Sequence, residues 1–427
     1  MQTSFTAGQL ADPDIRESEG ILRKCVHCGF CTATCPTYVL LGDERDSPRG
    51  RIYLIKEMLE KGRPASATVV RHIDRCLSCL ACVTTCPSGV DYMHLVDHAR
   101  AHIERTYRRP PGERLLRWLL AHTLPHPGRF ALLAAAGRLV QPLAGLLPGR
   151  LRAGLALLPR SPGRTPRAGA GVHPARGTPR LRVALLAGCV QDTLAPDINA
   201  ATIRLLTRLG VEVVVAPDAG CCGALVHHMG RVEEARAAAR RNVAAWEALT
   251  AGGLDAIVAN ASGCGTMLKD YAHLLRDDAA WAPRAQRIAA LARDVSEIVA
   301  SLGLESASAP PLTVAYHAAC SLQHGQRLAS PPRDLLTRAG YRVVDPVEGH
   351  LCCGSAGTYN ILQPALADRL GARKAARLAA TRANVVAAGN VGCMVQIARH
   401  AGLPVVHTVE LLDWATGGPR PAALGEG

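Results

Sequence analysis

Eight of the sixteen cysteines fall into two runs with the spacing Cys-x2-Cys-x2-Cys-x3-Cys-Pro. The runs are Cys25, Cys28, Cys31 and Cys35, then Cys76, Cys79, Cys82 and Cys86. Three thiolates at two-residue intervals can each bind one iron of a cubane cluster, and in two-cluster ferredoxins the fourth cysteine ligates the other cluster. The spacing therefore predicts two [4Fe–4S] clusters. One would use Cys25, Cys28, Cys31 and Cys86, and the other Cys76, Cys79, Cys82 and Cys35. Zinc sites usually pair two short Cys-x-x-Cys elements and do not show this quadruple spacing.

The other eight cysteines form an internal repeat. Its copies are Cys189, Cys221, Cys222 and Cys264, then Cys320, Cys352, Cys353 and Cys393. The first cysteine precedes the adjacent pair by 32 residues in both copies, and Gly follows each pair. This agreement indicates duplicated domains, called CCG domains below. Two adjacent thiolates and two distant ones could bind a further iron–sulfur cluster, bind zinc, or form an active-site dithiol.

Four histidines lie near these cysteines. His317 and His350 precede Cys320 and Cys352, and His227 and His228 follow the first pair. A lone histidine is more often a satisfied structural residue than a metal ligand. We therefore expect structural roles for most of them.

The elements that position these residues indicate an α+β multidomain protein. Residues 1–99 are expected to form a helical two-cluster ferredoxin-type domain, with a helical insert over Arg51–Lys61. Residues 100–159 have helical leucine spacing and form a basic connector. Residues 160–180 have the Pro, Gly and Arg content of a disordered linker. The two α/β CCG domains then cover residues 181–305 and 306–427.

Each CCG domain alternates strands with helices, which predicts a parallel sheet buried on both faces. Expected strands are 182–187, 211–216 and 256–260 in the first copy, and 312–316, 341–344, 385–388 and 405–406 in the second. Cys189, Cys264, Cys320 and Cys393 each follow a strand. Because sites in open α/β sheets lie at the carboxyl ends of strands, the four cysteines of each copy are expected to converge.

The net charge of +14 is concentrated in one segment. Residues 100–180 hold fifteen arginines and two glutamates. No nucleic-acid-binding module accompanies them, so nucleic acid is not the expected partner. An anionic membrane surface or an acidic partner subunit fits the interleaved Leu, Ala and Pro better, and a solvated linker is the alternative. The most apolar stretch, 130–148, is interrupted by Arg138 and Pro142, so we expect no membrane span.

The compartment follows from the cysteines and from the first twenty residues. These residues lack the basic and apolar regions of a secretory signal, so the thiols are expected to be ligands and not disulfides. We therefore expect a cytoplasmic protein, with peripheral contact to the cytoplasmic face of the inner membrane as a further hypothesis. The sequence shows no dinucleotide fingerprint, phosphate loop, acid–base constellation or flavin domain. Since iron–sulfur clusters transfer single electrons, a partner must oxidise the substrate.

With both cysteine runs and both repeats in place, the whole chain resembles the iron–sulfur subunit of glycolate oxidase (glycolate dehydrogenase). The matching segments include CVHCGFCTATCPTY, CLSCLACVTTCPSGV and LCCGSAGTYN. The resemblance implies an oxidoreductase complex in which a flavin subunit oxidises glycolate to glyoxylate. Electrons then pass through this chain toward a membrane quinone, and the isolated chain would not oxidise glycolate. All eight N-terminal cysteines match the family's ligands.

Two alternatives stay open at this point. Iron–sulfur subunits of flavin-linked lactate or glycerol-3-phosphate dehydrogenases share parts of this layout. Heterodisulfide reductases share the CCG domains and would act at the CCG site itself. Their domains end in Cys-x-x-Cys, whereas Met267 and Gln396 occupy the last of these positions here. Each copy thus has four thiols instead of five, which argues against a non-cubane cluster.

Overall fold

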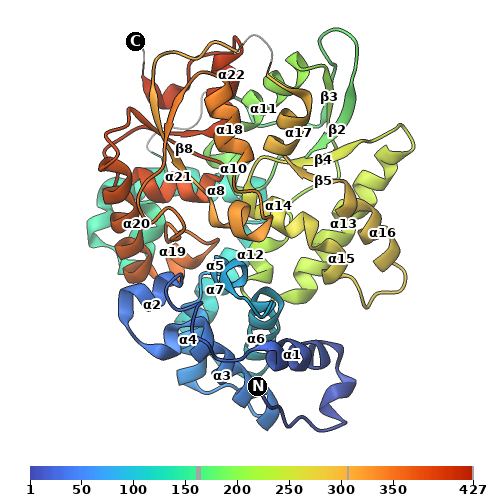
Figure 1. The fold of residues 1–427 in the computed structure, drawn as a ribbon, viewed down its shortest axis with the longest axis vertical. Helices are drawn as coiled ribbons and strands as arrows, with labels where there is room; N and C mark the ends of the chain where they lie inside the picture. The colour runs from blue at the N-terminus through green and yellow to red at the C-terminus, as the bar shows by residue number, and fades with distance from the viewer. Residues whose placement is uncertain (160–164, 305–306, 426–427) are drawn as a thin grey trace.

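The computed structural model describes residues 1–159, 165–304 and 307–425. The N-terminal domain is helical, as expected, and lies at one end of the molecule (Figure 1). Its elements are η1 (Gln9–Ala11), α1 (Pro13–Lys24), α2 (Pro36–Leu41), η2 (Glu44–Asp46), α3 (Pro48–Lys61), α4 (Ala67–Asp74), α5 (Ala81–Thr85) and α6 (Tyr92–Thr106). Proline occupies the first turn of α1, α2 and α3, where its missing N–H costs nothing.

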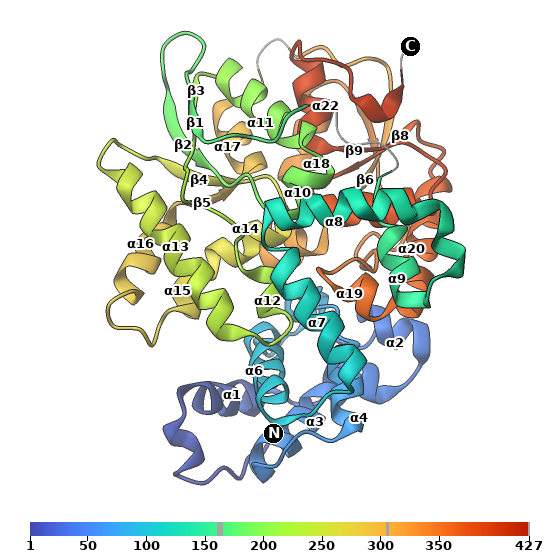
Figure 2. The ribbon, with the colours of Figure 1, turned by 180° about the vertical axis from the view of Figure 1, so that it is seen from behind.

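The basic connector is helical as predicted. It comprises α7 (Pro111–Thr123), α8 (Pro127–Val140), η3 (Gln141–Leu146) and α9 (Gly149–Leu155), which cross one face of the molecule (Figure 2). Each of α7 and α8 begins at a proline, so the turns at Pro110–Pro111 and Pro125–Pro127 divide the connector into separate helices. Within the described residues, no helix combines the length and apolarity needed to cross a bilayer.

The first CCG domain is built on a five-stranded sheet in the order β1-β3-β2-β4-β5. Its strands are β1 (Gly171–His173), β2 (Leu181–Leu185), β3 (Val211–Val215), β4 (Ala256–Ala259) and β5 (Ala292–Asp294). Its helices are α10 (Val190–Leu194), α11 (Asp197–Arg208), α12 (Ala224–His227), α13 (Val232–Thr250), α14 (Ser262–Lys269), α15 (Tyr271–Leu274), α16 (Ala282–Leu291) and α17 (Val295–Leu302).

The expectation that residues 160–180 are disordered is wrong where β1 forms. Residues 160–164 lie outside the described residues, but Gly171–His173 pairs antiparallel with β3, with Val172 opposite Val214. An edge strand is held by backbone hydrogen bonds to one neighbouring strand, whatever its side chains are. The Pro- and Gly-rich composition of this segment therefore gave no sign of β1. The other pairings of this sheet are parallel, as predicted.

The second CCG domain repeats this arrangement with the order β7-β6-β8-β9, all parallel. Its strands are β6 (Thr313–His317), β7 (Arg342–Val344), β8 (Val385–Ala388) and β9 (Val405–His407). The helices are η4 (Ser321–Gly325), α18 (Pro331–Arg338), α19 (Tyr359–Leu362), α20 (Pro364–Ala379), α21 (Val391–Ala398), α22 (Thr408–Ala415) and η5 (Ala422–Leu424). Since β3-β2-β4-β5 and β7-β6-β8-β9 have the same connectivity, the duplication predicted from cysteine spacing is confirmed in the fold.

The two CCG domains share one buried apolar core. Val183 and Leu185 of β2 belong to the same cluster as Val314 and Tyr316 of β6. Between the sheets, α11 packs on α22 and α17 packs on α18, so each copy contributes the equivalent pair of helices. At this seam the buried carboxylate of Asp413 accepts hydrogen bonds from Arg204 and Arg208. The sites of both copies are therefore held in one rigid unit.

Charged contacts join the N-terminal domain to the first CCG domain. His94 of α6 hydrogen-bonds Asp91 (2.8 Å) and reaches across to Asp270 (3.0 Å). Its ring stacks on His273, whose other neighbour is Glu17 of α1. Burial lowers the pKa of His94, but the hydrogen bonds to Asp270 and Asp91 outweigh it and raise the pKa from 6.5 to about 10.

We predict that His94 makes domain docking sensitive to alkaline pH. Because the folded-state pKa exceeds the unfolded value, the stabilisation is fully present below about pH 6.5 and is lost as pH rises toward 10. The difference in thermal unfolding midpoint between the wild type and His94→Gln should thus be largest near pH 6 and should shrink with rising pH. A His350→Gln variant, altered at an exposed histidine, should show no such trend. A pH-independent difference for His94→Gln would contradict this prediction.

Candidate iron–sulfur sites

The two N-terminal cysteine loops have the same backbone conformation. The residue before the second cysteine has a positive φ in both loops, at His27 (56°) and Ser78 (48°). The residue after it also does, at Gly29 (86°) and Leu80 (61°). Left-handed conformations are uncommon for residues other than glycine, so three such residues at matched positions indicate a loop conformation imposed by function.

These loops place the eight cysteines around two neighbouring cavities. Cys25, Cys28, Cys31 and Cys86 line one, while Cys35, Cys76, Cys79 and Cys82 line the other. Cys82 and Tyr92 border both cavities, so the two lie side by side. The fourth cysteine of each run thus lies with the first three cysteines of the other run. Cys28 is exposed, whereas the cysteines of the second group are all buried.

A buried charge network surrounds the second cavity. The Arg51 guanidinium is 1% exposed, lies 3.7 Å from the Cys35 sulfur, and donates hydrogen bonds to the His72 carbonyl (2.7 Å) and to Asp46 (3.3 Å). Asp46 is completely buried and also contacts His72 Nδ1 and Arg75. Although burial opposes its charge, nearby groups including Cys76 and Cys35 raise the pKa of Arg51, so it stays a cation beside the Cys35 sulfur.

Arg51 was not among the functional residues predicted from the sequence. A signal existed: Arg51 lies one turn before Ile55 and two turns before Met58 and Leu59 on the buried face of α3. A charged residue on an apolar helical face requires a buried partner, and here the partners are Asp46 and the Cys35 thiol.

The four thiols of each CCG copy converge, as predicted. In the first copy the Cys189 and Cys221 sulfurs are 3.3 Å apart, and Cys222 hydrogen-bonds Cys264. In the second copy the Cys320 and Cys352 sulfurs are 3.7 Å apart, and Cys353 hydrogen-bonds Cys393. Among the described residues all sixteen cysteines are free thiols.

The glycine of each Cys-Cys-Gly triplet is required by geometry. Gly223 and Gly354 both have φ of 90°, and each donates its N–H to the sulfur of the first cysteine of the pair at 3.5 Å. A Cβ at Gly354 would lie 2.7 Å from the Ala367 carbonyl oxygen, and one at Gly223 would lie 3.2 Å from that of Ala235. Only glycine lets the adjacent thiols turn inward beneath α20 and α13.

The other residues considered from the sequence lie in different surroundings. His227 and His228 face Asp97 of α6 at 3.8 and 3.9 Å, whereas His350 is exposed. The last cysteine of the heterodisulfide reductase pattern is replaced by Met267 in the first copy and by Gln396 in the second. Met267 packs in an apolar core, and the side-chain amide of Gln396 donates to the Ala367 carbonyl.

The second CCG site lies against the N-terminal domain. Cys79 and Cys352 belong to the same buried apolar cluster, and Cys320 packs against it. The phenol of Tyr359 donates to the Arg75 carbonyl (3.1 Å), which fixes this junction. A ligand of the second ferredoxin-type cavity and a thiol of the second repeat are therefore joined by close packing.

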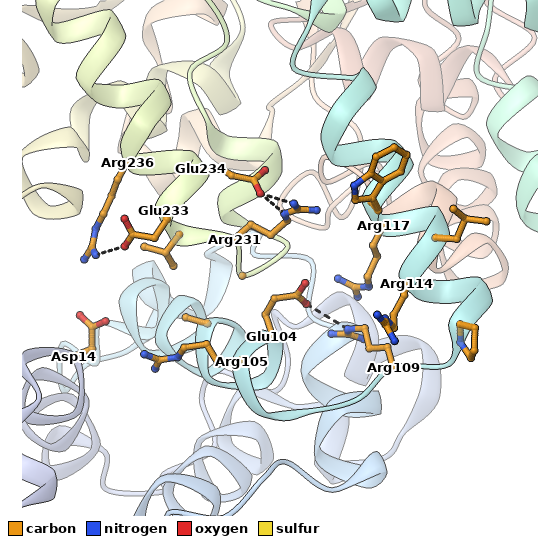
Figure 3. A pocket seen from close by; sticks show the side chains of 16 residues that line it. Asp14, Glu104, Arg105, Arg109, Arg114, Arg117, Arg231, Glu233, Glu234 and Arg236 are labelled. Carbon is orange, nitrogen blue, oxygen red and sulfur yellow. Dashed lines mark hydrogen bonds and ion pairs between the residues drawn. The ribbon is translucent and has the colours of Figure 1, made fainter.

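A cavity of about 810 Å³ between α6, α7 and the start of α13 has a different character (Figure 3). Arginines dominate its lining, and no cysteine contributes to it. Its acidic side chains pair with arginines, for example Glu104 with Arg109 and Glu234 with Arg231. We interpret it as a charged seam between domains.

Comparison with known proteins agrees with these sites. Residues 24–90 match the 4Fe-4S dicluster domain, and residues 183–269 and 314–398 match the cysteine-rich CCG domain. The chain is 41% identical to the glycolate oxidase iron-sulfur subunit of Escherichia coli (strain K12), over 97% of this chain and 99% of that protein. The chain belongs to the glycolate oxidase iron–sulfur subunit family.

A second family member is named "Probable glycolate oxidase iron-sulfur subunit" in Bacillus subtilis (strain 168). It is 34% identical over 94% of this chain and 96% of its own length. The fold also resembles the crystal structure of a hypothetical protein from Helicobacter pylori, with a TM-score of 0.53, 10% identity and coverage of 99% of this chain and 75% of that one. The family and its dicluster domain confirm the prediction of two [4Fe–4S] clusters in the N-terminal domain.

We predict that Arg51 stabilises the fold and sets a cluster potential. In Arg51→Met the buried Asp46 carboxylate keeps Arg75 but loses the Arg51 guanidinium, and this partial loss of compensation should cost about 1–3 kcal/mol in urea unfolding. Loss of the positive charge beside Cys35 should also lower one cluster's reduction potential, by an amount on the order of tens of millivolts, measured by EPR-monitored titration. Arg45→Met removes an exposed partner of Asp43 and should change neither quantity. Unchanged potentials in folded Arg51→Met would contradict the second effect.

Proposed function

We propose that this chain is the electron-transfer subunit of a glycolate-oxidising complex. It would receive electrons from a flavin subunit that converts glycolate to glyoxylate and deliver them to a membrane quinone. The observation that supports this most strongly is full-length similarity to the E. coli glycolate oxidase iron-sulfur subunit, with both domain types in the same order. The clusters supply one-electron transfer, whereas substrate oxidation belongs to the partner.

We assign the ligands of the two clusters to the two groups of cysteines. Cys25, Cys28, Cys31 and Cys86 would hold the first cluster, and Cys35, Cys76, Cys79 and Cys82 the second. The shared cavity linings support this exchange of the fourth cysteine. The second cluster would then be held by four buried cysteines beside the Arg51–Asp46 pair, whereas the first would include the exposed Cys28.

The first cavity opens on a surface suited to the partner. Val26 and Phe30, which flank the exposed Cys28, are 67% and 65% exposed. Large apolar side chains in such positions are typical of protein–protein contacts. We therefore propose that the flavin subunit docks over the loop that holds Cys25, Cys28 and Cys31.

The purified chain should show cluster absorbance but no glycolate oxidation, and activity should return when the flavin subunit is added. Phe30→Glu should weaken partner binding in a pull-down and slow cluster reduction by glycolate at least tenfold, with the cluster spectrum unchanged. Val172→Glu, which changes an exposed apolar residue on β1, should behave like the wild type. Glycolate oxidation by the chain alone would refute the proposed function. Normal binding by Phe30→Glu would refute only the docking surface.

The connector provides a surface suited to an anionic membrane. Nine large apolar side chains are exposed on α7 to α9, and they are Leu115, Trp118, Leu132, Leu133, Leu139, Val140, Leu143, Leu146 and Leu151. Arg129, Arg150 and Arg152 are exposed among them, and the sequence has no acidic residue between Glu113 and Asp192. The connector helices lie on one face of the molecule and expose both leucines and arginines. Helices that lie in a membrane interface have this composition, because their apolar side chains insert between the lipids and their basic side chains attract anionic headgroups.

We expect the chain to float with vesicles that contain anionic phospholipid and to detach as salt rises, because the Debye length falls. Leu139→Glu with Leu146→Glu should abolish flotation. Val347→Glu, which alters an exposed apolar residue of the second CCG domain, should retain it. Flotation that is unaffected by the double substitution would exclude the connector as the membrane-binding surface.

A further inference from the structure

His317 is a buried histidine whose ring has no hydrogen-bond partner in the described structure. It is the last residue of β6, is 1% exposed, and neither Nδ1 nor Nε2 is paired. Leaving a polar group buried without a partner costs roughly 1–3 kcal/mol, so such a group in a folded protein needs an explanation. Burial lowers the pKa of His317 well below its usual value.

The atoms that face this ring are thiols. One ring nitrogen of His317 and the sulfurs of Cys353 and Cys393 all lie within 4.8 Å of one another. Cys353 also hydrogen-bonds Cys352, and the Cys352 sulfur lies 3.7 Å from the Cys320 sulfur. The second copy therefore gathers four thiols and one imidazole. Imidazole and thiolate are both good ligands for iron and zinc.

The first copy lacks this nitrogen. Its equivalent position, three residues before the first cysteine, is Leu186, which is 3% exposed in an apolar core. His227 and His228 do not substitute for it, because they face Asp97 on the N-terminal domain. The two copies thus have equivalent sets of four thiols, but only the second adds an imidazole to them.

A buried lysine also distinguishes the second copy. Lys374 of α20 is 3% exposed, and its ammonium donates to the carbonyls of Glu348 (3.0 Å) and Gly349 (3.2 Å). Burial lowers the pKa of Lys374, and the four thiols of this copy oppose that lowering. Near the first copy, by contrast, the Arg241 side chain that donates to the Cys221 carbonyl is exposed.

We propose that the second CCG domain binds a redox-active iron–sulfur centre in which His317 supplies a nitrogen ligand, while the first copy offers only thiolates. Thiolate and imidazole together ligate iron–sulfur centres of the Rieske type, and the proposed electron-transfer function favours such a centre over a single zinc ion. Packing of Cys352 against Cys79 would place this centre next to the second N-terminal cluster. Replacing thiolate by neutral imidazole raises the reduction potential, as does the nearby ammonium. The centre would therefore accept electrons from the second N-terminal cluster. This step rests on the proposed electron-transfer function.

The test uses the full chain, purified without oxygen and labelled with 15N-histidine. Pulsed EPR of the wild type should show coupling to a histidine nitrogen, and iron should exceed eight per chain. His317→Leu, which installs the residue of the first copy, should lose this coupling. His317→Cys should also lose it, keep the iron and lower the potential of that centre. His350→Gln, two residues before Cys352, should match the wild type.

Several outcomes would overturn the inference. These are the absence of histidine coupling in both the oxidised and the reduced wild type, its persistence in His317→Leu or His317→Cys, and zinc in place of the additional iron. None of these readouts requires glycolate or the partner subunit. Failure of the flavin subunit to reduce the chain would instead refute the proposed function and leave the nitrogen coupling intact.

Discussion

Burial of anionic sulfur ligands is the constraint on which the rest of the structure depends. A cluster with four thiolates is anionic, and a low-dielectric interior penalises uncompensated charge. The segment between the two cysteine runs supplies the positive charge that compensates the sulfur ligands. It brings Arg51 within 3.7 Å of the Cys35 sulfur, and it adds Asp46 to hold the guanidinium in place. In the second CCG domain the buried Lys374 donates to the Glu348 and Gly349 carbonyls, and the four thiols oppose the lowering of its pKa by burial.

The shared core of the repeats explains how two similar sites can differ. Because α11 packs on α22 and α17 on α18, each CCG domain is stabilised by its partner copy, away from the cysteines at the strand ends. A residue beside the thiols can therefore change without disturbing the core. Leu186 and His317 occupy the same position relative to their cysteines, yet one completes an apolar cluster and the other faces sulfur.

Patterns with a local cause could be predicted from the sequence. Both cysteine runs, the duplicated α/β domains and the strands that precede Cys189, Cys264, Cys320 and Cys393 follow from spacing and hydropathy. Features that depend on distant partners could not. β5 (ARD) and β1 form because a neighbouring strand offers free backbone groups, not because their side chains favour strands. Arg51 was missed because its partners are set by tertiary packing.

The junctions of the N-terminal domain with the two repeats differ in kind. Toward the first repeat, charged hydrogen bonds such as His94 with Asp270 and His273 with Glu17 join the domains. Toward the second, the Tyr359–Arg75 hydrogen bond lies beside a buried apolar cluster that contains both Cys79 and Cys352. Electron transfer requires short, rigid, dry separations, whereas a titratable polar seam serves docking. This difference supports the proposal that the second repeat, and not the first, lies on the electron path from the ferredoxin-type domain.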